Sequence, residues 1–198
     1  MKKGEKILSL SRLYLVFLLF SFVGWLWETI HVSFLAGCLV DRGFLLGPIC
    51  PIYGFTIIIA YFTMGSITNP RGLLSIAKNK WYKYPLYIIS AIAIPTLAEL
   101  IIGIGFDVIF GIRLWDYSHY SVNIFGYQLP LHYKGYIALP ISLIWLGLIF
   151  VSMSVIVPCL LKLIAKIPPK ITKIIALSFA ITMVIDIAIS SILALIVK

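Results

Sequence analysis

Long apolar stretches dominate the chain and restrict what it can fold into. A helix needs about 20 mostly apolar residues to cross the hydrocarbon core of a bilayer. Stretches of that length run over residues 13–35, 44–67, 84–106, 135–161 and 171–197. The strands of a membrane β-barrel are shorter and alternate apolar with polar residues. We therefore expect an all-α membrane protein, a five-helix transmembrane bundle forming one domain over residues 1–198.

The composition excludes an ordinary soluble domain. The chain is 62% hydrophobic and 12% charged, whereas soluble domains are about a quarter charged. The net charge of +9 could suggest a nucleic-acid partner. The charges instead lie in short clusters between the apolar stretches, which is the pattern of a membrane protein. The lipid bilayer is thus the expected partner, and no nucleic acid is expected.

The clusters of Lys and Arg predict the orientation, because cytoplasmic loops are enriched in these residues. A cytoplasmic N-terminus and an external C-terminus would place twelve basic residues inside and four outside. The inside clusters are Lys2, Lys3, Lys6 and Arg12, then Arg71, Lys78, Lys80 and Lys83, then Lys162, Lys166, Lys170 and Lys173.

The first stretch could also be a cleaved signal, since residues 35–38 resemble a lipoprotein cleavage box ending at Cys38. A signal core spans about 7–15 residues, however, and this stretch is longer and contains Glu28. We expect it to be retained. The three cysteines, Cys38, Cys50 and Cys159, form no CxxC pair. They read as apolar filling residues, although Cys38 and Cys50 lie toward the same side and could pair.

Carboxylates inside the apolar stretches are the sharpest functional signal. A charged group at the centre of a membrane helix costs about 2.5–3.5 kcal/mol on insertion scales. Glu28 and Glu99 each lie fifteen positions from the cytoplasmic start of their stretch, which corresponds to about 22 Å. Asp186 lies at about 20 Å. All three acids are therefore expected in the outer third of the membrane.

The second stretch begins with features that interrupt a helix. Pro48 and Pro51 remove backbone donors, and Gly43 and Gly47 permit turns or close contacts. Irregular backbone at membrane depth requires protein or a water-filled cavity around it. The second helix is therefore expected to be broken near the carboxylates.

These features predict an outward-facing polar site in which Arg42 neutralises Glu28 and Glu99. The alternative is a buried polar cluster that only holds the helices together. Glu28 and His31 have a spacing that can bind a metal, but no second such pair exists, so no metal site is expected. The predicted substrate-binding residues are Glu28, Arg42, Tyr53, Glu99, Asp116, Trp115 and Asp41. No catalytic residue is assigned.

The longest polar stretch, residues 107–134, is rich in aromatic side chains. Such residues suit the membrane–water interface, and we expect an ordered cap on the outer surface. The aromatic residues are Trp115, Tyr117, Tyr120, Phe125, Tyr127 and Tyr133.

Three segments make the chain resemble a known family: Gly24-Trp-Leu-Trp-Glu28, Asp41-Arg-Gly-Phe-Leu-Leu-Gly-Pro-Ile-Cys-Pro-Ile-Tyr-Gly54 and Arg113-Leu-Trp-Asp-Tyr-Ser118. They are similar to the ABC-transporter type IV permeases, small multi-spanning bacterial membrane proteins. The resemblance covers residues 13–150 and implies a multi-pass protein of the bacterial cytoplasmic membrane. The chain departs from the family pattern at two places. Asp41 stands where members commonly carry Asn, and extra residues, up to Lys134, precede the fourth apolar stretch.

The leading functional hypothesis is a transporter subunit whose acids favour a cation or couple to protons. Five helices make a small bundle, so a homo-oligomer or a complex with a separate ATPase subunit is expected. The chain has no GxxxxGK[ST] motif and thus no P-loop of its own. One alternative is a membrane enzyme acting on a lipid or lipid-linked substrate, using carboxylates, Arg and Tyr for acid–base chemistry. The other alternative is a structural or assembly factor. No HExxH or GxSxG motif is present, and no cofactor is expected.

Overall fold

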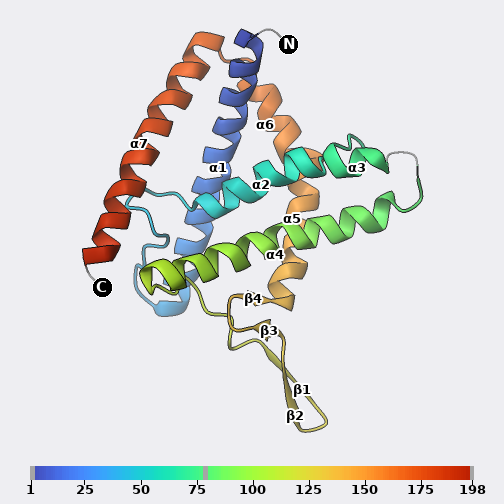
Figure 1. Cartoon of the computed structure of the whole chain (residues 1–198), viewed down its shortest axis with the longest axis vertical. Coiled ribbons are helices and arrows are strands. Elements are labelled where there is room, and N and C mark those ends of the chain that lie inside the picture. The colour runs from blue at the N-terminus through green and yellow to red at the C-terminus, as the bar shows by residue number, and fades with distance from the viewer. Residues whose placement is uncertain (1–2, 78–79, 197–198) are drawn as a thin grey trace. The chain divides into compact units, whose positions relative to one another are not determined.

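The computed structural model describes residues 3–77 and 80–196 and is mostly helical, at 69% (Figure 1). Of the positions used in the sequence predictions, Lys2, Lys78, Val197 and Lys198 lie outside the described residues. The chain forms two compact units. The first contains the described residues up to 58 and from 155 onward, and the second contains residues 59–154.

Seven α-helices and four short strands follow one another along the described residues. The helices are α1 (Lys3–Ala36), α2 (Pro51–Thr63), α3 (Gly72–Ile76), α4 (Lys83–Phe110), α5 (Leu139–Val151), α6 (Val157–Ile164) and α7 (Pro169–Ile196), with a π-helical turn, Ser152–Ile156, joining α5 to α6. The strands are β1 (Ser121–Ile124), β2 (Tyr127–Pro130), β3 (His132–Tyr133) and β4 (Ile137–Ala138).

Four helical segments in the described part of the chain are long and apolar enough to cross a membrane. They are Leu8–Ala36, Lys83–Phe110, Leu139–Ile164 and Pro169–Ile196, and they coincide with four of the five predicted stretches. The second prediction, residues 44–67, had the wrong helix boundaries. Residues 44–50 are not helical, and α2 has only 13 residues, or about 20 Å.

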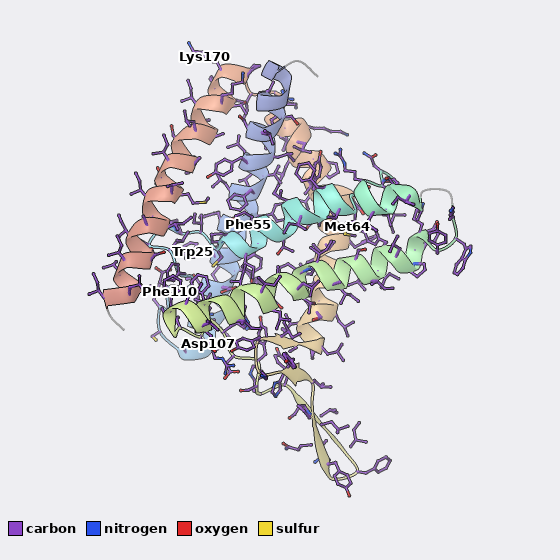
Figure 2. The ribbon with its side chains drawn as sticks, in the orientation of Figure 1. Trp25, Phe55, Met64, Asp107, Phe110 and Lys170 are labelled. Atoms are coloured by element: carbon purple, nitrogen blue, oxygen red, sulfur yellow. The ribbon has the colours of Figure 1, made fainter. Side chains whose placement is uncertain are left out.

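In the first unit, α1 packs against α2, α6 and α7. Phe55 of α2, labelled in Figure 2, meets Phe17 of α1 edge-on, and their ring centroids are 4.9 Å apart. Tyr14 donates a hydrogen bond to the sulfur of Met183 on α7 at 3.8 Å. Most apolar side chains of α7 are exposed. Such a surface is suited to lipid, which is as apolar as the side chains themselves.

In the second unit, α4 packs against α5 along a stripe of residues four positions apart. This stripe consists of Tyr87, Ala91, Pro95, Glu99 and Gly103, all buried. Residues four apart lie on one face of a helix, so the stripe forms a continuous contact surface. The Thr96 hydroxyl donates to the Ser142 hydroxyl of α5 at 2.8 Å.

The segment between α4 and α5 folds into two small antiparallel hairpins, β1–β2 and β3–β4. The all-α prediction was wrong here. The cause is a short alternation of apolar and polar residues on each side of the two-residue turn Phe125-Gly126. Period-two alternation favours a strand, but four residues are few enough to be overlooked. Leu139 N–H donates to the Leu131 carbonyl at 2.8 Å, which extends the β3–β4 pair to the start of α5. Tyr117 N–H donates to the Gly135 carbonyl at 2.9 Å, which ties the segment before β1 to the turn between β3 and β4.

Candidate functional site

Glu28, on α1, is the centre of a polar cluster in the first unit. Tyr53 of α2 donates its hydroxyl to Glu28 Oε1 at 2.7 Å. Arg42 Nε lies 3.6 Å from Glu28 Oε2, and both side chains are 27% exposed. A carboxylate at membrane depth requires partners of this kind, because an isolated charge would be costly there. The arrangement keeps Glu28 paired but still partly accessible.

Arg42 belongs to the non-helical segment 37–50, whose backbone is tied to polar side chains on α1. Val40 N–H donates to the Ser33 hydroxyl at 2.9 Å, and Arg42 N–H donates to Thr29 Oγ1 at 3.3 Å. Cys50 N–H donates to the carbonyl of Ser21 at 2.9 Å. These bonds replace those that a helix would supply, as backbone groups at membrane depth demand.

Asp186 of α7 holds the middle of the same segment. Its carboxylate accepts the N–H groups of Leu46 and Gly47 at 2.9 and 2.8 Å. It also accepts the hydroxyl of Ser190 at 3.0 Å. A carboxylate is a strong acceptor for backbone N–H groups, so Asp186 stabilises the irregular backbone that presents Arg42. A Cβ at Gly47 would lie 2.9 Å from Asp186 Oδ2.

Local sequence explains why helix α2 begins only at Pro51. Gly43 adopts φ +109°, a conformation that side chains disfavour. Pro51 is the first residue of α2, and proline is favoured at that position because its missing N–H would have no helical partner. Nearby, Asp41 accepts the indole N–H of Trp25 at 2.8 Å.

Glu99 lies in the second unit and is 4% exposed. Trp145 of α5 donates its indole N–H to Glu99 Oε1 at 3.0 Å, and the Tyr117 hydroxyl donates to the same oxygen at 3.4 Å. Hydrogen bonds to the carboxylate offset part of the cost of burying it in an apolar setting. Sequence reasoning missed Trp145, whose aromatic ring reads as a lipid or core residue.

A second polar cluster in this unit lies at the end of α4. The Tyr136 hydroxyl donates to Asp107 Oδ2 at 2.5 Å, and the Arg113 guanidinium lies 4.9 Å from the centre of the Tyr136 ring. The hydrogen bond to Asp107 raises the pKa of Tyr136, because ionisation would break it. Sequence reasoning missed this pair, which is separated by 29 positions.

Asp116 is exposed and belongs to the loop that follows α4. It accepts the N–H of Ser118 at 2.9 Å and lies 3.7 Å from Arg113. The hydrogen bond from Ser118, followed by the charge of Arg113, lowers the pKa of Asp116. Trp115 donates its indole N–H to the Tyr136 carbonyl at 2.8 Å, which fixes the loop to the turn between β3 and β4.

The polar clusters around Glu28, Glu99 and Asp107 fall within residues 15–191, the part of the chain that matches the family described as putative ABC-transporter type IV. The chain belongs to this family. The match covers residues 15–36 of α1 and most of α7, and it confirms the resemblance seen in the three sequence segments. No curated protein and no solved structure matches the chain.

The structure of this ABC-transporter type IV family member brings together Glu28, Arg42 and Tyr53. Asp41 belongs to the same unit and pairs with Trp25. The three predicted residues of the second unit, Glu99, Trp115 and Asp116, have separate partners. That Glu28 and Glu99 act at one site remains a prediction from the sequence.

The remaining sequence signals have structural counterparts in the described part of the chain. His31 stacks on Trp27, with ring centroids 6.0 Å apart. No group of three or more His, Cys, Asp or Glu side chains is placed to hold a metal ion within residues 3–77 and 80–196. Cys38 and Cys159 are exposed, Cys50 is buried, and all three are free thiols.

Proposed function

We propose that this protein is the membrane-spanning permease subunit of an ABC-type transporter in a bacterial cytoplasmic membrane. Membership of the ABC-transporter type IV family and four long apolar helices support this role. Residues 1–198 would form a single transmembrane domain with the N-terminus inside. A separate ATPase subunit would supply the energy, since the sequence contains no P-loop.

The proposed domain crosses the membrane five times. Both α1 and α4 follow clusters of Lys and Arg, so both would start in the cytoplasm. The chain must then cross back between them. The crossing would be made by segment 37–50 together with α2. The 13 residues of α2 are too short to span the hydrocarbon core alone, so the irregular backbone before it would cover the remaining depth.

The observation that carries the proposed substrate site is the triad of Glu28, Arg42 and Tyr53. It combines a paired but partly exposed carboxylate with the guanidinium of the irregular segment 37–50 and a hydroxyl of α2. Transporter sites near interrupted helices have this character. In the proposal, Glu28 favours a cation or a cationic group of the substrate. Asp41 lies on the same segment. Glu99, Trp115 and Asp116 are proposed as substrate contacts supplied by the second unit.

The decisive experiment is affinity purification of the full chain from native membranes in mild detergent, followed by identification of bound proteins. Recovery of an ATPase is expected. The purified complex would then be reconstituted, and the ATPase rate would be measured with fractionated medium as the source of substrate. Glu28→Gln should retain the ATPase subunit but lose the stimulated rate, because its shape is kept and its charge is not.

Thr182→Ala is the matched control, since Thr182 is exposed on α7 and bonds only the Ser178 carbonyl of its own helix. It should behave as the wild type. If the pure protein turns over a lipid without any ATPase, the membrane-enzyme alternative replaces the proposal. If neither an ATPase nor a turnover is found, the assembly-factor alternative does.

A further inference from the structure

The β1–β2 hairpin has one apolar and one polar face. Its register pairs Val122 with Leu129 and Ile124 with Tyr127. Residues two apart, and residues directly opposite each other in antiparallel strands, lie on the same side of a sheet. These four side chains therefore share one face. The other face carries Ser121, Asn123, Gln128 and Pro130.

Within the second unit, no described residue covers the apolar face. All eight strand residues are exposed, including Tyr127 at 75% and Leu129 at 48%. Figure 1 shows the hairpin projecting from the β3–β4 pair next to the start of α5. A two-stranded hairpin is marginally stable in water and normally packs an apolar face against something. The hairpin thus lacks its packing partner.

The turn of the hairpin presents a further apolar group. Phe125 is 98% exposed and adopts φ +50°, a conformation rarely adopted by bulky residues and costly by about 1–3 kcal/mol. Asn123 Oδ1 accepts the N–H of Gly126 at 3.0 Å and holds the turn. Asn, Asp or Gly would satisfy the turn at lower cost, so folding alone does not explain a phenylalanine there.

Charge and position indicate what covers this face. Residues 117–133 contain no Asp, Glu, Lys or Arg, so nothing in the hairpin offers complementarity to a charged partner. The hairpin is inserted between two membrane-spanning helices, α4 and α5. Apolar side chains stay exposed at the ends that flank it, such as Val108 and Leu139. Both ends of the segment that carries the hairpin are thus joined to helix ends with exposed apolar side chains, which suit lipid.

We propose that the β1–β2 hairpin is a membrane-interface anchor. Its apolar face and Phe125 rest in the outer leaflet of the bilayer that the helices cross, and its polar face contacts water. Aromatic and aliphatic side chains suit this depth, and an amphipathic element lies flat in it. Water at the interface also satisfies the unpaired outer edges of the two strands, which the hydrocarbon core could not do.

The test measures the surroundings of single nitroxide labels in proteoliposomes of neutral phosphatidylcholine. Exposed Cys38 and Cys159 are replaced by serine, and Cys50 is left in place because it is buried. One variant carries Ile124→Cys on the apolar face, and Gln128→Cys on the polar face is its matched control. Collision rates with oxygen, which concentrates in lipid, are compared with those of a water-soluble nickel chelate.

The ratio of oxygen to chelate collisions should be several-fold higher at position 124 than at 128, and high again for Phe125→Cys. Equal access of the chelate to positions 124 and 128 would overturn the proposal, because the apolar face would then be in water. If the label at position 124 collides with neither oxygen nor the chelate, the apolar face is covered by protein and the proposal is wrong. Dipolar broadening between labels would then indicate a second copy of the chain, and its absence would indicate a different protein. Thermal unfolding of each labelled variant verifies that it is folded.

Discussion

At the level of single residues, the ion pair of Glu28 and Arg42 offers the clearest energetic test. Arg42→Ala should leave the carboxylate without its cation, which costs about 3–5 kcal/mol for a fully buried pair. Both side chains are 27% exposed, so we expect the low end, about 3 kcal/mol. Glu28→Gln should be milder, and in the double variant the loss from Arg42→Ala should shrink. Thermal unfolding in detergent measures the cycle, and strictly additive effects would show that the pair does not interact.

Asp186 supports a second prediction about single residues, because it accepts two backbone N–H groups from a segment 139 or 140 positions away. Asp186→Asn replaces one acceptor oxygen by a donor and leaves at least one N–H unsatisfied, at about 1–3 kcal/mol. Hydrogen exchange of the peptide covering residues 43–50 should accelerate. Ser190→Ala removes a donor to the same carboxylate and should accelerate it less. Unchanged protection in Asp186→Asn would refute this role.

Among the elements, α4 carries two glycines that the structure distinguishes sharply. A Cβ at Gly103 would lie 3.1 Å from Tyr136 Cδ1 and 3.3 Å from Trp115 Cζ2, whereas one at Gly105 would meet nothing within 4 Å. Gly103→Ala should lower the free energy of unfolding by about 1 kcal/mol, the low end for an overpacked contact, because the new methyl group would crowd Trp115 and Tyr136. Gly105→Ala should be neutral or stabilising by up to about 1 kcal/mol, since Ala favours helices. Thermal unfolding compares the two, and equal midpoints would contradict the packing.

The elements also show how far sequence reasoning could reach. Helices α1, α4 and α7 were predictable because length and apolarity decide them without knowledge of their neighbours. Segment 37–50 was recognised as irregular from Pro48 and Pro51, but the late start of α2 could not be placed. Its backbone bonds go to Asp186, far along the chain, and no local pattern encodes such a partner. For the same reason Asp186 was assigned no partner from the sequence and was left out of the predicted site.

The candidate site was partly predictable for a related reason. Glu28 and Arg42 were found because charges in apolar stretches demand partners, and the structure pairs them. The indole of Trp145 was not found, since an aromatic residue in an apolar stretch carries no sign that its N–H is used. Charged site residues can therefore be predicted from a membrane-protein sequence, whereas the neutral hydrogen-bond donors around them cannot.

For the whole molecule, the number of crossings decides which residues face each side. If α2 did not cross, Lys and Arg would number seven inside and nine outside, against twelve and four for five crossings. The positive-inside rule therefore favours five. Reporter fusions at Ser121 and Lys166 separate the two arrangements. Five crossings place Ser121 outside and Lys166 inside, and four crossings reverse both. An external signal at Lys166 would thus show that segment 37–50 and α2 turn back to the outer face without crossing, and Arg42 would lose its proposed place in a crossing segment.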